Sequence, residues 1–374
     1  MTLAEPVGVV RPHEKFLPAD TAVQYLDVSG TPVASTARYV RPDDDRLAQM
    51  YRKMVIGRRF DEQATALTKQ GRLAVYPSSR GQEACQIAAA MSLEPTDWMF
   101  PTYRDSVALA ARGIAPADIL TTFAGDWHCG YDPVAHRCAP QCTPLATQLL
   151  HATGLAYAQT RRGSDAVALA FCGDGGTSEG DFHEALNFAA VFGAPVVFLV
   201  QNNGYAISVP LSRQTVAPSL AHKGIGYGIG SEQVDGNDPM AMMAVMDQAA
   251  RFVRAGNGPV IVEAHTYRIE AHTNADDATR YRESDEVELW RARDPITRLE
   301  RYLRAQGRID DQFSCALTDE ANAVAAEVRE AMNRDRQSDP RELFAYVYAR
   351  PTSQLEQEQA DIVAELSGED GGGP

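Results

Sequence analysis

The sequence has few cysteines, no long apolar run and no excess of positive charge, and each of these absences excludes a class of protein. Six cysteines in 374 residues are too few and too scattered for a disulfide framework. No apolar run approaches the ~20 residues that a membrane span needs, and the N-terminus has neither the basic start nor the apolar segment of a signal peptide. The 35 lysines and arginines are outnumbered by 50 aspartates and glutamates, which gives a net charge of −15. The sequence therefore predicts a cytoplasmic protein that binds neither nucleic acid nor membrane.

The rest of the composition is that of an ordinary globular protein. Hydrophobic residues make up 44% and charged residues 23% of the chain, and a chain of this length can bury a large core. Residues 1–42 are rich in proline and polar residues, which indicates an N-terminal arm. We expect residues 43–285 to form one α/β domain, residues 286–366 to form a helical C-terminal region of the same unit, and residues 367–374 to form a flexible tail.

Strand-sized apolar runs alternate with helical patterns in the middle of the chain. The runs are Ala166–Cys172, Pro195–Gln201, Ile229–Val234 and Pro259–Ala264. Runs of this length that are apolar throughout are typical of strands buried on both faces. Their alternation with helices predicts an α/β fold with a doubly wound, mostly parallel sheet and helices on both of its faces.

A glycine-rich turn, residues 173–180, follows the first of these runs. Glycines let backbone N–H groups approach an anion, and the start of a helix favours negative charge. Asp174 within this turn would repel a phosphate unless a divalent cation lay between them, as Mg²⁺ does. Asn203 follows the next strand, Pro195–Gln201, and lies 203 − 174 = 29 residues after Asp174, about the ~30 residues of a βαβ unit. Because parallel strands end at one shared crevice, we expect Asp174 and Asn203 to hold one cation there.

This pairing resembles the signature of thiamine diphosphate enzymes. From about residue 24 to the C-terminal helices, the chain is similar to the alpha subunit of the decarboxylating first component of 2-oxo acid dehydrogenase complexes. The matching stretches are Gln70–Leu73, Gly81–Ala84, Tyr103–Asp105, Pro144–Gln148, Gly173–Asp181, Asn202–Ser208, Val234–Asp238 and Asp276–Arg282. The resemblance implies the thiamine-diphosphate-binding fold, with thiamine diphosphate and magnesium as cofactors.

The resemblance also implies the residues of the site. Asp174, Asn203 and the carbonyl of Tyr205 would hold magnesium, and His272, on a loop that closes over the cofactor, would be catalytic in acyl transfer. The remaining cofactor-binding positions are Tyr103, Arg104, Thr143, Leu145, Gly173, Gly175, Gly176, Gln201 and Arg268. Gln201 replaces an arginine that some branched-chain relatives direct at the diphosphate, which makes it a weaker anion contact.

The activity that follows is oxidative decarboxylation of a 2-oxo acid and reductive acylation of a lipoyl domain of the acyltransferase core. We favour a branched-chain substrate such as 3-methyl-2-oxobutanoate, with pyruvate as the alternative. In relatives, a beta subunit supplies the carboxylate that activates the aminopyrimidine. The chain is therefore expected to work only with its beta subunit, in a heterotetramer of two alpha and two beta chains.

The sequence contains three other candidate sites. Branched-chain relatives bind potassium at the positions of Cys142, Pro144, Thr147 and Gln148, but Cys142 replaces a serine and is a poor potassium ligand. The cluster of His128, Cys129, His136, Cys138 and Cys142 fits no common zinc spacing. Ser178 lies in a Gly-x-Ser-x-Gly pattern typical of serine hydrolases, yet it lies well beyond the end of its strand.

Two features of the sequence near His272 concern its loop: a departure from the family pattern at residues 270 and 271, and a threonine at a position that is regulated in some relatives. Glu270-Ala271 stands where relatives usually have glycine followed by proline or histidine, and a carboxylate there is unfavourable near a diphosphate unless it points away. Thr273 occupies the position that is phosphorylated in animal relatives, although nothing in this sequence indicates a kinase.

Overall fold

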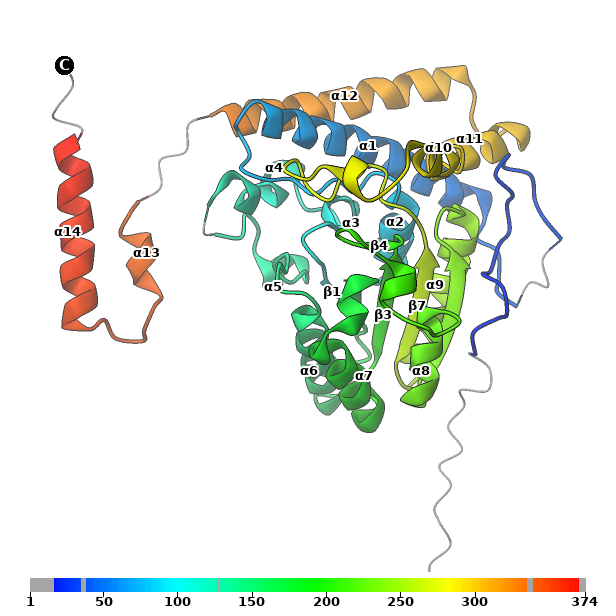
Figure 1. The fold of residues 1–374 in the computed structure, drawn as a ribbon, viewed down its shortest axis with the longest axis horizontal. Coiled ribbons are helices and arrows are strands. Elements are labelled where there is room, and N and C mark those ends of the chain that lie inside the picture. The colour runs from blue at the N-terminus through cyan, green and yellow to red at the C-terminus, as the bar shows by residue number, and fades with distance from the viewer. Residues whose placement is uncertain (1–16, 35–37, 127, 335–338, 370–374) are drawn as a thin grey trace, which may run out of the picture.

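The computed structural model describes residues 17–34, 38–126, 128–334 and 339–369. Within these ranges a five-stranded sheet forms the centre of the molecule, and helices cover it (Figure 1). The strands are β1 (Trp98–Phe100), β2 (Ala168–Gly173), β3 (Val196–Asn202), β4 (Tyr205–Ala206), β5 (Val209–Pro210), β6 (Gly230–Asp235) and β7 (Val260–His265). The helices are α1 (Asp44–Lys69), α2 (Glu83–Met91), α3 (Ser106–Ala111), α4 (Pro116–Ile119), α5 (Pro133–His136), α6 (Thr147–Arg161), α7 (Gly180–Phe192), α8 (Lys223–Gly226), α9 (Pro239–Arg254), α10 (Ser284–Arg291), α11 (Pro295–Ala305), α12 (Asp311–Asn333), α13 (Glu342–Ala345) and α14 (Ser353–Glu369). Short 3₁₀ helices span Thr122–Ala124, Gly175–Ser178, Leu211–Arg213, Leu220–His222 and Ala278–Arg280.

The sheet is parallel throughout, with the strand order β1–β2–β3–β7–β6. Its register aligns the ends of the three middle strands, because Gly173 lies opposite Gln201 and Asn202 lies opposite His265. The residues that follow these strands therefore leave the sheet at the same edge. The predicted α/β fold with a parallel sheet is confirmed.

Both faces of the sheet are buried. Successive residues of a strand point to opposite faces, so Ala168 and Ala170 of β2 pack with α6 and α7, whereas Leu169 and Phe171 pack in a second core with α1, α2 and α9. This two-sided burial explains why the strands are apolar at every position rather than at alternate ones. The predicted helices on both faces are present.

The helical C-terminal region begins at α10 and packs on the domain through α11 and α12. Figure 1 shows α12 lying along α1, and Leu317, Val328 and Met332 of α12 belong to the same core as α1. Helix α14 lies apart from the main body (Figure 1), whereas α13 contacts it through Glu342, which lies 2.9 Å from His128. Helix α14 continues to Glu369, three residues into the range predicted as a tail, and residues 370–374 lie outside the described residues. Within the described ranges, no helix combines the length and apolar character needed to cross a membrane.

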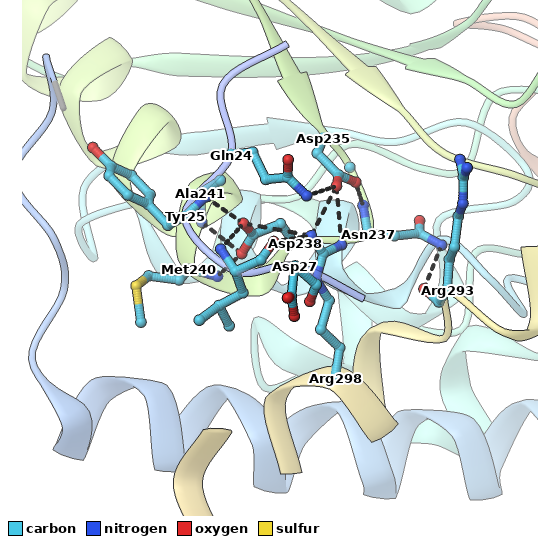
Figure 2. Close-up of polar contacts among 12 residues, drawn as sticks. Gln24, Tyr25, Asp27, Asp235, Asn237, Asp238, Met240, Ala241, Arg293 and Arg298 are labelled. Atoms are coloured by element: carbon cyan, nitrogen blue, oxygen red, sulfur yellow. Dashed lines mark hydrogen bonds and ion pairs between the residues drawn. The ribbon is translucent and has the colours of Figure 1, made fainter. Parts of the chain in front are cut away.

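The predicted N-terminal arm is described from residue 17 onward, apart from residues 35–37, while residues 1–16 lie outside the described residues. Figure 2 shows how residues 24–27 of the arm are held. The Asp238 carboxylate accepts hydrogen bonds from the backbone N–H groups of Tyr25 (2.6 Å) and Leu26 (2.7 Å), and its other oxygen caps α9. Arg298 of α11 donates to the carbonyls of Leu26 and Asp27 and pairs with Asp235. The arm is therefore joined to β6, α9 and α11 through buried polar contacts.

Candidate functional site

A cavity of about 220 Å³ lies where β1, β2, β3 and β7 end. The residues that line it are Gln82, Thr102, Tyr103, Arg104, Leu145, Gly173, Asp174, Gly175, Gly176, Glu179, Gln201, Asn203, Tyr205, Ala206, Ile207, Arg268 and His272. Twelve of the thirteen cofactor-binding positions predicted from the sequence are among them. Thr143 is the exception, since it is exposed and does not line the cavity.

The glycine-rich turn after β2 packs closely against its neighbours. A Cβ atom at Gly175 would lie 2.6 Å from the Cβ of Ala206, and one at Gly176 would lie 2.6 Å from the Sγ of Cys172. Any larger residue would push the turn away from the hairpin β4–β5 or from β2. The two glycines therefore keep the turn close to the floor of the cavity.

Asp174 and Asn203 meet in this cavity, as their spacing predicts. Asp174 is 1% exposed, and its Oδ2 accepts a hydrogen bond from Nε2 of Gln214 at 2.7 Å. Burial, the largest cause, raises the pKa of the Asp174 carboxyl, and among the described residues no arginine, lysine or histidine forms an ion pair with it. The phenol of Tyr205 donates to Glu286 at 2.8 Å, so a contact from Tyr205 to a ligand in the cavity falls to its backbone. A carboxylate, an amide oxygen and a carbonyl are the ligands that Mg²⁺ prefers.

A buried chain of hydrogen bonds between side-chain amides holds the Asn203 side chain in place. Nδ2 of Asn203 donates to Oε1 of Gln82 (3.2 Å), Nε2 of Gln82 donates to Oε1 of Gln201 (2.9 Å), and Nε2 of Gln201 donates to Asp105 (2.6 Å). Gln201 is thus held in place by neighbours rather than left free as a surface amide. Sequence reasoning missed Gln82, which reaches Asn203 across 121 positions of the chain.

His272 lies between two guanidinium groups. Its Nδ1 is 3.1 Å from Nη2 of Arg104 and 3.2 Å from Nη1 of Arg268. Both arginines can only donate, so Nδ1 accepts and the ring proton is assigned to Nε2. Burial, followed by the charges of Arg104 and Arg268, lowers the pKa of His272 to about 4. His272 is therefore a neutral imidazole at physiological pH.

Arg268 has donor capacity left over. Its Nη2 donates to the carbonyl of Ile207 (2.8 Å) and to the hydroxyl of Tyr281 (2.9 Å), while its buried Nε has no hydrogen-bond partner among the described residues. A buried donor without a partner is uncommon in proteins. Together with Arg104, it gives the cavity the chemistry to bind an anion.

Ile207 is a lining residue that the sequence did not indicate. It has φ = 55°, in the left-handed region that β-branched residues rarely adopt, and its side chain remains 54% exposed at the cavity. Such strain persists where the surrounding structure enforces it, here through the bond from Arg268 to the Ile207 carbonyl.

The loop that carries His272 is well anchored. The carboxylate of Glu270 pairs with Arg80 at 3.3 Å and does not line the cavity, so it points away from the site as the sequence argument requires. Arg282 donates to the carbonyls of Arg268, Ile269 and Glu270. Thr273, next to His272, is half-buried.

The residues considered for a potassium site, a zinc site and a catalytic serine make other contacts or lie outside the cavity in the part of the chain that the structure describes. Near the potassium positions, the thiol of Cys142 donates to the carbonyl of Pro144 (3.2 Å), Thr147 donates to Asp181 (3.0 Å), and Gln148 donates to the carbonyl of Phe171 (2.7 Å). In the part of the chain that the structure describes, no three His, Cys, Asp or Glu side chains gather as a metal site. Ser178 is exposed and outside the cavity, and no hydrogen bond to a histidine is described for it.

Comparison with known proteins places the chain among relatives along most of its length. Residues 51–342 match the family described as "Dehydrogenase E1 component". The chain is 45% identical over 361 residues to the 3-methyl-2-oxobutanoate dehydrogenase subunit alpha of Mycobacterium tuberculosis, covering 96% of this chain and 98% of that protein. It is 38% identical over 320 residues to the pyruvate dehydrogenase E1 component subunit alpha of Staphylococcus aureus, covering 84% of this chain and 86% of that protein.

Proposed function

The chain belongs to the dehydrogenase E1 component family of thiamine-diphosphate-dependent 2-oxo acid dehydrogenases, and we propose that it is an alpha subunit acting on a branched-chain 2-oxo acid such as 3-methyl-2-oxobutanoate. The branched-chain part of this proposal rests on the 45% identity to the 3-methyl-2-oxobutanoate dehydrogenase subunit alpha. The cofactor part rests on one observation, the meeting of Asp174 and Asn203 with Arg104 and Arg268 in one cavity. A carboxylate and two guanidinium groups around the same space suit a cation bound to an anion. A magnesium diphosphate has this combination of charges.

The residues present fit thiamine diphosphate and magnesium. Asp174 and Asn203 offer oxygen ligands for magnesium together with the Tyr205 carbonyl, and the buried Asp174 carboxylate lacks a described cation of its own. The unpartnered Nε of Arg268 and the turn at Gly175 and Gly176 suit the diphosphate. When bound, thiamine diphosphate supplies the electron sink for loss of carbon dioxide from a 2-oxo acid.

We propose that His272 is the residue of this chain that places a proton next to the substrate. Because Nδ1 accepts from Arg104 and Arg268, Nε2 carries the only ring proton. A neutral imidazole can donate a hydrogen bond through this N–H group to a substrate oxygen. Arg104 also donates to the His272 carbonyl, and the His272 N–H donates to Asp276. Together with the two guanidinium contacts to Nδ1, these bonds hold the ring in one orientation.

The site is completed by a beta subunit, which an alpha subunit of this family implies. We propose two alpha and two beta chains, with acyl transfer to a lipoyl domain. Exposed apolar side chains gather on α6 and α7, namely Tyr157, Phe188, Val191 and Phe192, and such a patch is typical of a subunit interface. All six cysteines are unpaired, which suits the reducing cytoplasm that we propose as the location.

Substrate preference is tested by comparing two acids. The complex of this chain with its beta subunit is assayed with thiamine diphosphate, magnesium and an artificial electron acceptor. We expect kcat/KM for 3-methyl-2-oxobutanoate to exceed that for pyruvate by about tenfold or more, because each additional buried methyl group of a substrate contributes about 10-fold or more in selectivity. A preference for pyruvate would favour the alternative supported by the similarity to pyruvate dehydrogenase alpha subunits.

A further inference from the structure

A buried carboxylate outside the cavity organises one of its walls. Asp61, on α1, is 2% exposed and does not line the cavity. Its two oxygens accept hydrogen bonds from the hydroxyl of Tyr76 (2.9 Å), the hydroxyl of Ser78 (2.6 Å) and the backbone N–H of Ser79 (2.7 Å). One side chain thus accepts from three donors within four residues, 76–79, of an irregular segment.

The same segment, Tyr76–Gly81, holds Arg104. The guanidinium of Arg104 donates through Nη1 to the carbonyl of Ser78 at 2.9 Å, and the carbonyl of Arg104 accepts from the hydroxyl of Ser79 at 2.6 Å. Arg104 in turn donates through Nη2 to Nδ1 and to the carbonyl of His272. Asp61 is therefore two hydrogen bonds away from Arg104 and three from His272.

The segment 76–81 also contacts the loop that carries His272. The carbonyl of Arg80 accepts from the N–H of Ile269 (3.1 Å), and the carbonyl of Gly81 accepts from the hydroxyl of Thr266 (2.8 Å). Gly81 has φ = 96°, and a side chain there would clash with the carbonyl of Tyr267. The segment therefore lies between α1 and both partners of the Arg104–His272 contact.

We propose that Asp61 is a positioning residue: by fixing the segment 76–81, it holds Arg104 against His272. For its effect on catalysis, this proposal rests on the function proposed above. Three donors on one buried carboxylate are more than the packing of α1 requires, since its other buried residues are almost all apolar. The segment itself has no helix or strand to hold it, so its geometry depends on these side-chain contacts.

The test compares Asp61→Asn with a matched buried aspartate that has no link to the cavity. Asp97 is 0% exposed and accepts from the N–H groups of Glu94 and Val167 and from Arg254, at the opposite end of β1 and β2. Both variants of the full chain are expected to lose stability, so stability alone does not separate them. The deciding measurement is the pKa of His272 by NMR of chain labelled in its histidine rings, with the signal identified by its loss in His272→Gln.

The groups that face His272 are Arg104, Arg268, the carboxylate of Asp276 and the ring of Tyr103. In Asp61→Asn, Arg104 is expected to loosen, and the pKa of His272 is expected to rise from about 4 toward its ordinary value of 6.5. In Asp97→Asn it stays at the value of the parent. With the beta subunit present, half-saturation by thiamine diphosphate is expected to need about tenfold more cofactor in Asp61→Asn, the equivalent of ~1.4 kcal/mol.

Ser79→Ala covers the case in which Asp61→Asn does not fold. This variant keeps the Asp61 carboxylate and removes only the hydroxyl that holds the Arg104 carbonyl, so the His272 signal is expected to move in the same direction by less. The proposal is overturned if both variants lose stability as Asp97→Asn does while the His272 pKa stays unchanged. A parent complex that does not respond to thiamine diphosphate would contradict the proposed function instead, and the His272 signal would still decide the role of Asp61.

Discussion

At the scale of single residues, the cavity combines the buried carboxylate of Asp174 with two arginines and the neutral imidazole of His272. The Asp174 carboxylate has only Gln214 as a described side-chain partner, while Arg104 and Arg268 direct their charge at His272. Each charge is arranged around space that a magnesium diphosphate would fill. Removing one charge at a time therefore has separable consequences.

Asp174→Asn tests the cation ligand. Loss of one charged contact is worth ~1.5–3 kcal/mol, so we expect affinity for magnesium thiamine diphosphate to fall about 10- to 100-fold. The stability of the unliganded chain should be kept, because a neutral amide replaces a carboxylate whose ionised form is disfavoured by burial. Glu179→Gln, an exposed position in the same cavity, is the control and should bind as the parent does. Isothermal calorimetry on the assembled complex measures both, and equal affinity for Asp174→Asn would contradict the assignment.

His272 gives a prediction about pH. Its pKa is about 4 in the folded chain and 6.5 when unperturbed, so between these values the unfolded chain binds a proton that the folded chain does not. The free energy of unfolding must then fall as the pH is lowered from 6.5 to 4. In His272→Gln this contribution is lost, and the dependence on pH becomes flatter in that window. Urea unfolding at a series of pH values measures the slope, with the exposed His151→Gln as control; an unchanged slope for His272→Gln would show that the two guanidinium groups do not suppress its protonation.

Strand periodicity predicts cavity residues that directly follow strands, and the resemblance adds others such as Leu145. Neither assigned Gln82 or Ile207 to the site. Asp174 and Asn203 come after apolar runs, so strand periodicity places both at one edge of the sheet. Gln82 lies at the start of α2, and its contact with Asn203 depends on tertiary packing that no local pattern encodes. The position of Ile207 in the site could not be predicted for another reason. Its positive φ contradicts the local preference of a β-branched residue.

At the scale of elements, the polar junction in Figure 2 links the arm to the domain. Asp238 both caps α9 and accepts from the arm backbone, and Arg298 is 1% exposed with its guanidinium on Asp235 and two arm carbonyls. Local sequence patterns favour a helix start at Pro239, since an aspartate precedes a proline there. They did not predict the use of the same aspartate by residues more than 200 positions earlier.

Arg298→Met tests this junction. Removing one partner of a buried ion pair leaves Asp235 and Asp238 uncompensated, which costs about 3–5 kcal/mol of unfolding free energy. Arg308 pairs with Asp44 and Asp45 at the surface, so Arg308→Met should cost less than about 1 kcal/mol. Denaturant unfolding compares the two variants, and cleavage of the arm by a protease should become faster in Arg298→Met alone. Similar losses in both variants would mean that the junction adds nothing beyond a surface ion pair.

At the scale of the whole molecule, the chain presents a cavity with the residues for a diphosphate and a cation. It also presents exposed apolar side chains on α6 and α7. The match along residues 51–342 identifies the family, and an alpha subunit of that family works with a beta subunit. The similarity to subunits of two different dehydrogenases leaves the substrate to experiment. The central claim is that this chain supplies the diphosphate half of a shared active site.

The measurement that tests this claim most directly is decarboxylation of 3-methyl-2-oxobutanoate by the chain alone and by the chain co-expressed with its beta subunit. Both preparations contain thiamine diphosphate, magnesium and an artificial electron acceptor. We predict no turnover by the chain alone and turnover, abolished in Asp174→Asn, when the beta subunit is present. Turnover by the isolated chain, or undiminished turnover in the Asp174→Asn complex, would contradict the account.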